Sequence, residues 1–149
     1  MQVYICSLLS AVPAAERREK GMNEDLLKNG AFSWFELMTT DVAGAEAFYK
    51  GIFGWETEKV PMEGGEYTII KVDGKGVGGM MEHPAECRGM PPSWDTYVTV
   101  DDVDAVAGRA ESLGGKVLRP PMDIPNVGRF CVIQDPQGAV LCPIAYAEE

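Results

Sequence analysis

The chain has 149 residues, of which 46% are hydrophobic and 24% are charged, a composition typical of one globular domain. It holds 13 Lys and Arg against 23 Asp and Glu, so its formal net charge is −10. This charge argues against nucleic acid and anionic membrane surfaces as partners, because both attract clustered positive charge. No apolar stretch reaches the roughly 18 residues expected of a membrane-spanning helix.

Residues 1–30 are predicted to form an N-terminal arm ahead of the main domain. An apolar run follows Met1, but the nearest positive charges come after this run, which is unlike a secretory signal. Three interpretations stay open: a disordered or loosely docked arm, a signal peptide, and a non-native extension before a start at Met22. The segment from Asn23 to Lys28 is predicted to make one helical turn.

The four cysteines lack CxxC spacing, and the chain has a single histidine. A structural zinc site would therefore have too few close ligands. Reduced thiols in a cytoplasmic protein are the simpler interpretation, and two disulfides are the alternative.

Two stretches of the chain carry the same pattern 60 positions apart. The matched pairs are Trp34 with Trp94, Thr39 with Thr99, Asp41 with Asp101, and Gly54 with Gly114. Each stretch predicts a strand, an aspartate that caps a helix, an amphipathic helix, and a glycine that ends the helix.

In chain order, the first half is predicted to hold a strand at 32–38, a helix at 42–53, and strands at 55–60, 66–72 and 77–81. The second half is predicted to hold a strand at 97–100, a helix at 103–113, and strands at 116–118, 128–134 and 139–146. The sequence therefore predicts an α+β fold. Two βαβββ modules, at about 31–82 and 94–146, pair into one pseudo-symmetric domain, 31–146, with a concave ligand cavity.

This pattern resembles the vicinal-oxygen-chelate superfamily, which includes glyoxalase I, extradiol dioxygenases and bleomycin resistance proteins. The resemblance rests on Asp41, Ala47-Phe48-Tyr49, Ile52-Phe53-Gly54-Trp55 and Asp135-Pro136-Gln137-Gly138. It implies the paired-module fold and a homodimer. A fold does not by itself fix an activity.

Metal-dependent members of that superfamily place ligands on the first and last strands of each half. The first-strand ligand stands seven residues before the capping aspartate. The matching positions here are Trp34, Met80, Trp94 and Cys142. Indole does not bind divalent metals and a thioether binds them poorly, so we expect no metal and no cofactor.

Side chains two apart on a strand share a face, so the same positions predict the cavity wall. The predicted ligand-binding residues are mostly apolar, with one carboxylate: Trp34, Glu36, Met38, Met80, Trp94, Thr96, Val98 and Cys142. Such a wall suits a planar or hydrophobic molecule stacked between indoles. Arg129 either holds a carboxylate of the ligand or forms a surface ion pair.

Glu36 is the candidate catalytic residue, because a carboxylate inside an apolar cavity is costly to bury without a partner. It acts as a general base or orients the ligand, or it simply pairs with an arginine such as Arg129. Cys142 is more typical of a small core residue than of a nucleophile, since no base stands beside it. His83 is more typical of a solvated loop.

The leading hypothesis is a cytoplasmic, metal-independent protein that binds a small organic ligand, with basic compounds favoured by the negative charge. The alternative is a superfamily enzyme, a lyase, isomerase or dioxygenase. It would use a divalent metal held by residues such as Glu36, Glu82 or His83, or Glu36 as acid and base. A third hypothesis is a structural or regulatory protein with no ligand.

Overall fold

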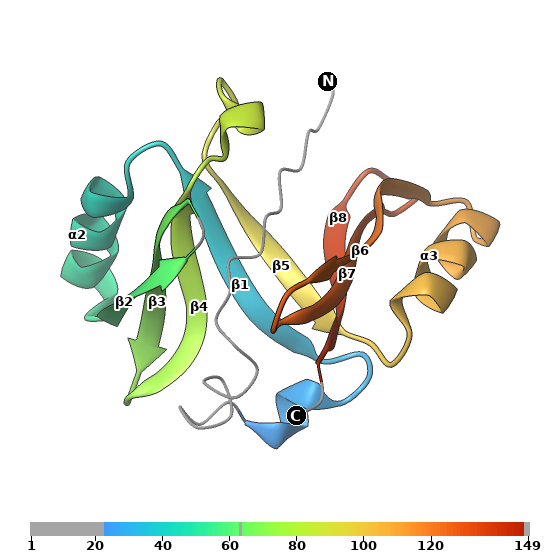
Figure 1. The fold of residues 1–149 in the computed structure, drawn as a ribbon, viewed down its shortest axis with the longest axis horizontal. Coiled ribbons are helices and arrows are strands. Elements are labelled where there is room, and N and C mark those ends of the chain that lie inside the picture. Colours follow the sequence, from blue (N-terminus) through green and yellow to red (C-terminus); the bar gives the residue numbers. More distant parts are fainter. Residues whose placement is uncertain (1–22, 63, 148–149) are drawn as a thin grey trace.

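The computed structural model describes residues 23–62 and 64–147, and Figure 1 shows their arrangement. The first half contains β1 (Phe32–Thr39), α2 (Val42–Phe53), β2 (Glu56–Met62), β3 (Gly65–Val72) and β4 (Lys75–Glu82). The second half contains β5 (Ser93–Thr99), α3 (Val103–Ser112), β6 (Lys116–Ile124), β7 (Gly128–Gln134) and β8 (Val140–Tyr146). Two short 3-10 turns, η1 (Glu24–Leu27) and η2 (Ala85–Cys87), precede β1 and β5. The predicted α+β class is confirmed.

The eight strands form one sheet in the order β2-β3-β4-β1-β5-β8-β7-β6. β1 and β5 are antiparallel at its centre, and each pairs in parallel with the last strand of its own half. Figure 1 shows α2 and α3 at opposite ends of the molecule, with β1 and β5 between them. The two halves therefore meet along a single backbone ladder.

Local hydrogen bonds explain where the two helices begin. The Asp41 carboxylate accepts from the Gly44 backbone N–H at 2.8 Å and caps α2. In the second half Asp102, rather than the predicted Asp101, accepts from the Ala105 backbone N–H at 3.0 Å. The two capping residues are thus 61 positions apart instead of 60.

The core divides between the two faces of the sheet. On the helix face, α2 covers Leu37, Ile70 and Met80, and α3 covers Val100 and Cys131. The opposite face, called the interior face below, gathers side chains from both halves. Its largest buried members are Trp34, Met38, Tyr67, Ile69, Tyr97, Phe130 and Ile144.

β2 and β6 are the outer edges of the sheet. β6 is longer than predicted, because it continues through Pro120 and Pro121 to Ile124 with two shifts in register. Proline is tolerated there because an edge strand leaves some backbone N–H groups without a ladder partner.

The prediction for the N-terminal arm falls mostly on residues 1–22, outside the described residues. Asn23 caps η1, as the predicted turn requires. Cys131 and Cys142 are buried free thiols, whereas Cys87 is disulfide-bonded, so the expectation of reduced cysteines is wrong for Cys87. Within residues 23–62 and 64–147, no helix has the length and apolar character needed to cross a membrane.

Candidate functional site

Glu36 lies in the middle of β1 on the interior face and is fully buried. Its two carboxylate oxygens each accept a hydrogen bond from a tyrosine, from Tyr67 Oη at 2.9 Å and from Tyr97 Oη at 3.3 Å. Trp34 Nε1 donates in turn to Tyr67 Oη at 2.9 Å. These four side chains form a buried polar chain, in which tyrosine hydroxyls hold the carboxylate.

The strand register brings the buried polar chain together. Trp34 lies opposite Tyr97 where β1 pairs with β5. Tyr67 comes from β3 and reaches the chain across β4 at Gly79. A Cβ atom at position 79 would lie 1.9 Å from the Tyr67 hydroxyl oxygen, so the glycine leaves the room that this hydroxyl needs.

Asp95 is a second carboxylate on the interior face, and it is not among the residues predicted from the sequence. It is the register partner of Glu36 across β1 and β5, so the two side chains project from the same face. Burial raises the pKa of Asp95 to about 6. The signal that could have revealed it is Asp102, because a helix cap at this position puts Asp95 on the same face as Glu36.

The predicted placement of Trp94, Thr96 and Val98 on the cavity wall is wrong. Trp94 lies on the helix face, where its Nε1 donates to Tyr49 Oη at 3.2 Å and its ring meets Trp55. Thr96 and Val98 share that face, because side chains two apart on a strand point the same way. The physical reason is that Asp102, and not Asp101, caps α3. Counting back from the wrong aspartate shifts every position on β5 by one residue, and such a shift exchanges the two faces of a strand.

The predicted placement of Met80 is also wrong, because this side chain packs with Leu37 and Ile70 beneath α2. The register between β3 and β4 shifts after Ile70. An irregularity of this kind changes which residues face inward, so counting along β4 from its glycine turn ends on the wrong face.

Trp34, Met38 and Cys142 lie on the interior face and are buried, where the alternation predicts them. Cys142 pairs with Tyr97, as Gly79 pairs with Glu36 in the first half. The ligand-binding role of these residues stays a prediction.

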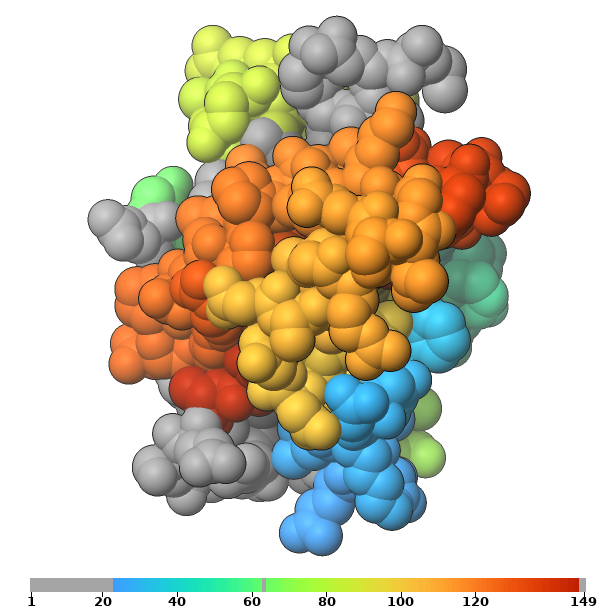
Figure 2. Space-filling model, turned by 90° about the vertical axis from the view of Figure 1, so that its right-hand side faces the viewer, coloured from blue at the N-terminus to red at the C-terminus, as the bar shows by residue number. Residues whose placement is uncertain are grey.

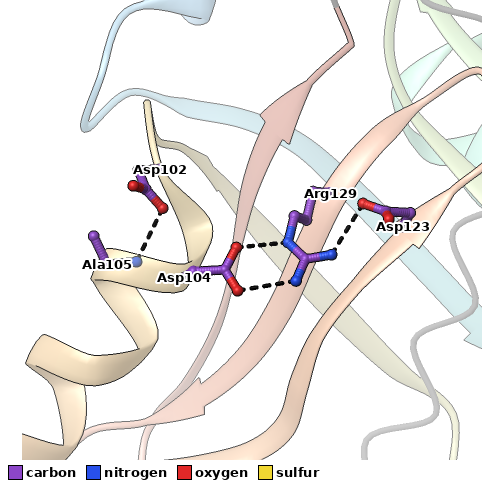
Figure 3. Close-up of polar contacts among 5 residues, drawn as sticks. All are labelled: Asp102, Asp104, Ala105, Asp123 and Arg129. Atoms are coloured by element: carbon purple, nitrogen blue, oxygen red, sulfur yellow. Dashed lines mark hydrogen bonds and ion pairs between the residues drawn. The ribbon is translucent and has the colours of Figure 1, made fainter.

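Arg129 on β7 lies between two carboxylates at the surface, as Figure 3 shows. Its Nε and Nη2 donate to Asp104 at 2.6 and 2.9 Å, and its Nη1 donates to Asp123 at 3.1 Å. Hydrogen bonding to the guanidinium lowers the pKa of Asp104. Arg129 therefore forms the surface ion pair that was one of its predicted roles, with Asp104 and Asp123 as partners rather than Glu36.

A cavity of about 1010 Å³ opens where the β1–α2 turn, the segment after β4 and the β6–β7 turn approach one another. Met62, Met81 and Phe130 supply apolar lining. The charged and titratable residues around it are Asp41, Lys59, Glu66, Glu82, His83 and Asp123. This cavity is therefore displaced from Glu36 toward one end of the sheet, and neither Glu36 nor Asp95 is among its lining residues.

His83 lies beside the cavity, and the expectation that it is solvated is wrong. Both of its ring nitrogens are buried, and neither has a hydrogen-bond partner among the described residues. Leaving a polar group buried and unpaired costs about 1–3 kcal/mol. A bound molecule that reached either nitrogen would remove part of this cost.

The residues of the interior face do not fit the divalent metal that many members of the resembled superfamily hold. With Asp102 as the cap, the position seven residues earlier is Asp95, so the four matching positions hold Trp34, Gly79, Asp95 and Cys142. Only Asp95 and Cys142 offer metal donors. In the part of the chain that the structure describes, no group of three His, Cys, Asp or Glu side chains could hold a metal ion.

Two βαβββ units that share one sheet and one interior face define a two-module α+β domain. The chain belongs to the Glyoxalase/Bleomycin resistance protein/Dioxygenase superfamily, whose family model matches residues 31–142. The resemblance noted from the sequence is thereby confirmed.

Solved structures share this fold at low identity. Methylmalonyl-CoA epimerase from Mycobacterium tuberculosis is 17% identical with a TM-score of 0.59, covering 87% of this chain and 96% of that one. The hypothetical protein BH1468 from Bacillus halodurans C-125 is 9% identical with a TM-score of 0.62, covering 82% of this chain and 98% of that one. At these identities the likeness concerns the fold alone.

Two relatives are closer in sequence. CFP32 of Mycobacterium tuberculosis, which carries a glyoxylase name, is 40% identical over 117 residues, 76% of this chain and 45% of that protein. The anthracycline biosynthesis protein DnrV of Streptomyces peucetius is 39% identical over 123 residues, 74% of this chain and 45% of that protein. The chain thus spans less than half the length of these relatives.

Proposed function

We propose that the chain is a metal-independent protein that binds a small organic molecule in the cavity beside His83. The cavity carries the proposal, because its volume of about 1010 Å³ lies at the upper end of the range for ligand pockets, roughly 300–1,000 Å³. The ring of His83, which has no hydrogen-bond partner within the described part of the chain, supports it, because a neutral imidazole offers one donor and one acceptor to a bound group.

We expect the ligand to be basic and mainly apolar. Met62, Met81 and Phe130 line the apolar part of the cavity. Around them four carboxylates face one lysine, and this Lys59 is paired with Glu66 at 3.1 Å. The net charge of −10 adds a field that attracts cations. The name of the relative DnrV makes an anthracycline a reasonable first probe.

The test is calorimetric titration of the full chain with an anthracycline and with cationic, neutral and anionic aromatic compounds of similar size. We expect the cationic compounds to bind most tightly. His83→Ala is expected to weaken binding by about tenfold, the effect of one lost hydrogen bond. Leu113→Ala, at an exposed residue outside the cavity lining, serves as the control. Binding by none of the compounds, or equal binding by His83→Ala, would contradict the proposal.

A second candidate is a metal-free lyase or isomerase of the superfamily that moves a proton between Glu36 and a substrate. The observation that favours it is the pairing of Glu36 with Asp95 across the two central strands. Because burial raises the pKa of Asp95 to about 6, this group can carry a proton close to neutral pH. Two carboxylates in different environments can divide the roles of acid and base.

An activity of this kind would be lost in Glu36→Gln, and the acid limb of its pH profile would move in Asp95→Asn. Turnover that survives both substitutions unchanged would remove the second candidate. Ligand binding without turnover would support the first candidate, a binding protein without catalytic activity.

We infer that the protein works in the cytoplasm, as predicted from the sequence. The free thiols of Cys131 and Cys142 support a reducing compartment, whereas the disulfide at Cys87 is more typical of an oxidising one. Fractionation of native cells tests this inference, and recovery of the protein outside the cytoplasm would contradict it.

A further inference from the structure

Most of the charged side chains that line the cavity are engaged with partners of their own. Lys59 Nζ lies 3.1 Å from Glu66 Oε1, so this pair is internally neutral. Asp41 accepts from the Gly44 backbone N–H, and its charge offsets the partial positive charge at the start of α2. These side chains therefore have little charge left to offer to a ligand.

Glu82, the last residue of β4, is different from the other carboxylates of the lining. Asp123 on β6 is engaged, because Arg129 Nη1 donates to it at 3.1 Å (Figure 3). Among the residues that the structure describes, no side chain donates a hydrogen bond to the Glu82 carboxylate or forms an ion pair with it. Within this part of the chain, Glu82 is therefore the lining carboxylate whose charge is uncompensated.

The backbone that carries Glu82 and His83 is fixed by the neighbouring strand. Glu82 is the register partner of Thr39 where β4 pairs with β1. The next residue continues this pairing, because the His83 backbone N–H donates to the Thr39 carbonyl oxygen at 2.9 Å. Pro84 then favours an extended conformation of His83. Both side chains thus project from a rigid backbone, so little backbone freedom is lost when a ligand binds.

The Glu82 carboxylate borders the cavity beside its apolar lining. Side chains two apart on a strand share a face, so Glu82 projects on the helix face, as Met80 does. Met81 packs with Phe130 on the interior face, and both supply apolar lining. This arrangement matches a ligand that has an apolar body and a charge at one end.

We propose that Glu82 selects for a cationic ligand, and that the ligand is an amphiphilic amine with a neutral hydrogen-bonding group close to its ammonium group. This inference rests on the proposed binding function of the cavity and names the chemistry that the cavity recognises. The ammonium group pairs with Glu82, and the neutral group, a carbonyl or a hydroxyl, meets the His83 ring. The two groups are neighbours on the ligand, because consecutive Cα atoms lie about 3.8 Å apart.

The same arrangement disfavours anionic ligands. Lys59 is the one lysine or arginine among the described lining residues, and Glu66 neutralises it. A carboxylate or phosphate on the ligand would instead face the charge of Glu82. A neutral analogue of the amine would keep the contact with His83 and lose only the ion pair, so discrimination between the two compounds isolates the role of Glu82.

Calorimetric titration of the full chain with two probes tests the proposal. One probe is an anthracycline that carries a sugar amine, and the other is the same compound with this amine acetylated, which removes the positive charge. Glu82 is exposed, so solvent screens its ion pair, and we expect Glu82→Gln to weaken binding of the amine by about three- to fivefold. Binding of the acetylated probe is expected to be unchanged. The difference between the probes measures the coupling of the carboxylate to the ammonium group.

Glu86→Gln is the matched control. It removes the same charge from an exposed glutamate in η2, which lies outside the cavity lining. Figure 2 shows the segment around η2, in yellow-green near the top of the view, projecting from the surface. We expect this variant to bind both probes as the native chain does. In about 0.5 M salt the effect of Glu82→Gln is expected to shrink, because salt screens exposed charges.

Equal weakening of both probes by Glu82→Gln would overturn the proposal, because a change in shape would then explain the loss. Weakening of the amine to the same degree by Glu86→Gln would overturn it as well, because the overall field would then account for the selectivity. If His83→Ala weakens binding and Glu82→Gln does not, the proposed function stands and this inference fails. If neither probe binds, this inference fails, and the proposed function fails with it when none of the other aromatic compounds binds either.

Discussion

The two halves of the molecule contain the same elements but differ in where they place polar groups. The first half carries the Glu36 carboxylate inside and aromatic rings outside on α2. The second half has Tyr97 at the matching position, five residues before its helix cap, and a charged outer surface around Arg129. The difference teaches that the shared βαβββ order sets the backbone, while each half distributes its polar side chains independently.

The sharpest test of this difference compares Glu36→Ala with Tyr97→Phe. Loss of Glu36 leaves two tyrosine hydroxyls without their acceptor and opens a cavity, so we expect a loss of about 4 kcal/mol in the free energy of unfolding. Tyr97→Phe removes one hydrogen bond and is expected to cost about 1 kcal/mol. Urea unfolding measures the free energy of unfolding of both variants. Equal losses would show that the two halves contribute equally to the stability of the buried polar chain.

A second comparison uses the matching positions of β4 and β8. Gly79→Ala would place a methyl group against the Tyr67 hydroxyl, and we expect it to cost about 3 kcal/mol of stability. Cys142→Ala, beside Tyr97, removes a buried sulfur without creating a clash and is expected to cost about 1 kcal/mol. Thermal unfolding of both variants checks this order, and a reversal would contradict the proposed role of the glycine.

The pH dependence of stability distinguishes Asp95 from Asp104, two carboxylates of the second half whose pKa values are shifted in opposite directions. The pKa of Asp95 is about 6 instead of 3.8, so the native chain binds this proton more tightly than the unfolded chain. The stability that Asp95 contributes is present below pH 4 and is lost as the pH rises toward 6. Asp95→Asn is therefore expected to be more stable than the native sequence by about 3 kcal/mol at pH 7 and equal to it near pH 4.

Asp104 provides the opposite sign within the same half. Arg129 lowers the pKa of Asp104, so this pair contributes stability at neutral pH that is lost as the pH falls through the lowered value. Urea unfolding between pH 3 and pH 8 measures both effects. A difference between Asp95→Asn and the native sequence that grows toward low pH would contradict the assignment.

The smallest expected effect belongs to Arg129→Ala. This ion-pair network is exposed to solvent, where screening leaves little net stabilisation. We expect Tm to fall by about 2 °C or less, and the difference to shrink in 1 M salt. Differential scanning calorimetry at two salt concentrations measures this difference in Tm. A fall beyond about 5 °C would mean that these exposed ion pairs stabilise the second half more than surface ion pairs normally do.

Local patterns predicted the first half well. The cap at Asp41, the helix of twelve residues and the stop at Gly54 depend on residues close together in the chain. The alternation along β1 correctly placed Trp34 and Glu36 inside. Each of these features is decided by spacings that can be read directly from the sequence.

The second half and the partners of Glu36 were less predictable. Asp101 and Asp102 are adjacent and chemically equivalent as caps, and only the folded chain distinguishes them. Taking Asp101 as the cap assigned every side chain of β5 to the wrong face of the sheet, so Asp95 was not predicted to lie inside. The tyrosines that hold Glu36 lie 31 and 61 residues away, so their contacts arise from strand register rather than from any local pattern.

The two outer strands of the sheet have a consequence for aggregation. β2 carries Glu56, Glu58 and Lys59 with Pro61 near its end, and β6 carries Pro120 and Pro121 within an irregular register. Edges of this composition resist the addition of a further strand, which is the step that extends a sheet into a fibril. The composition of these two edges therefore disfavours the growth of this protein into cross-β fibres.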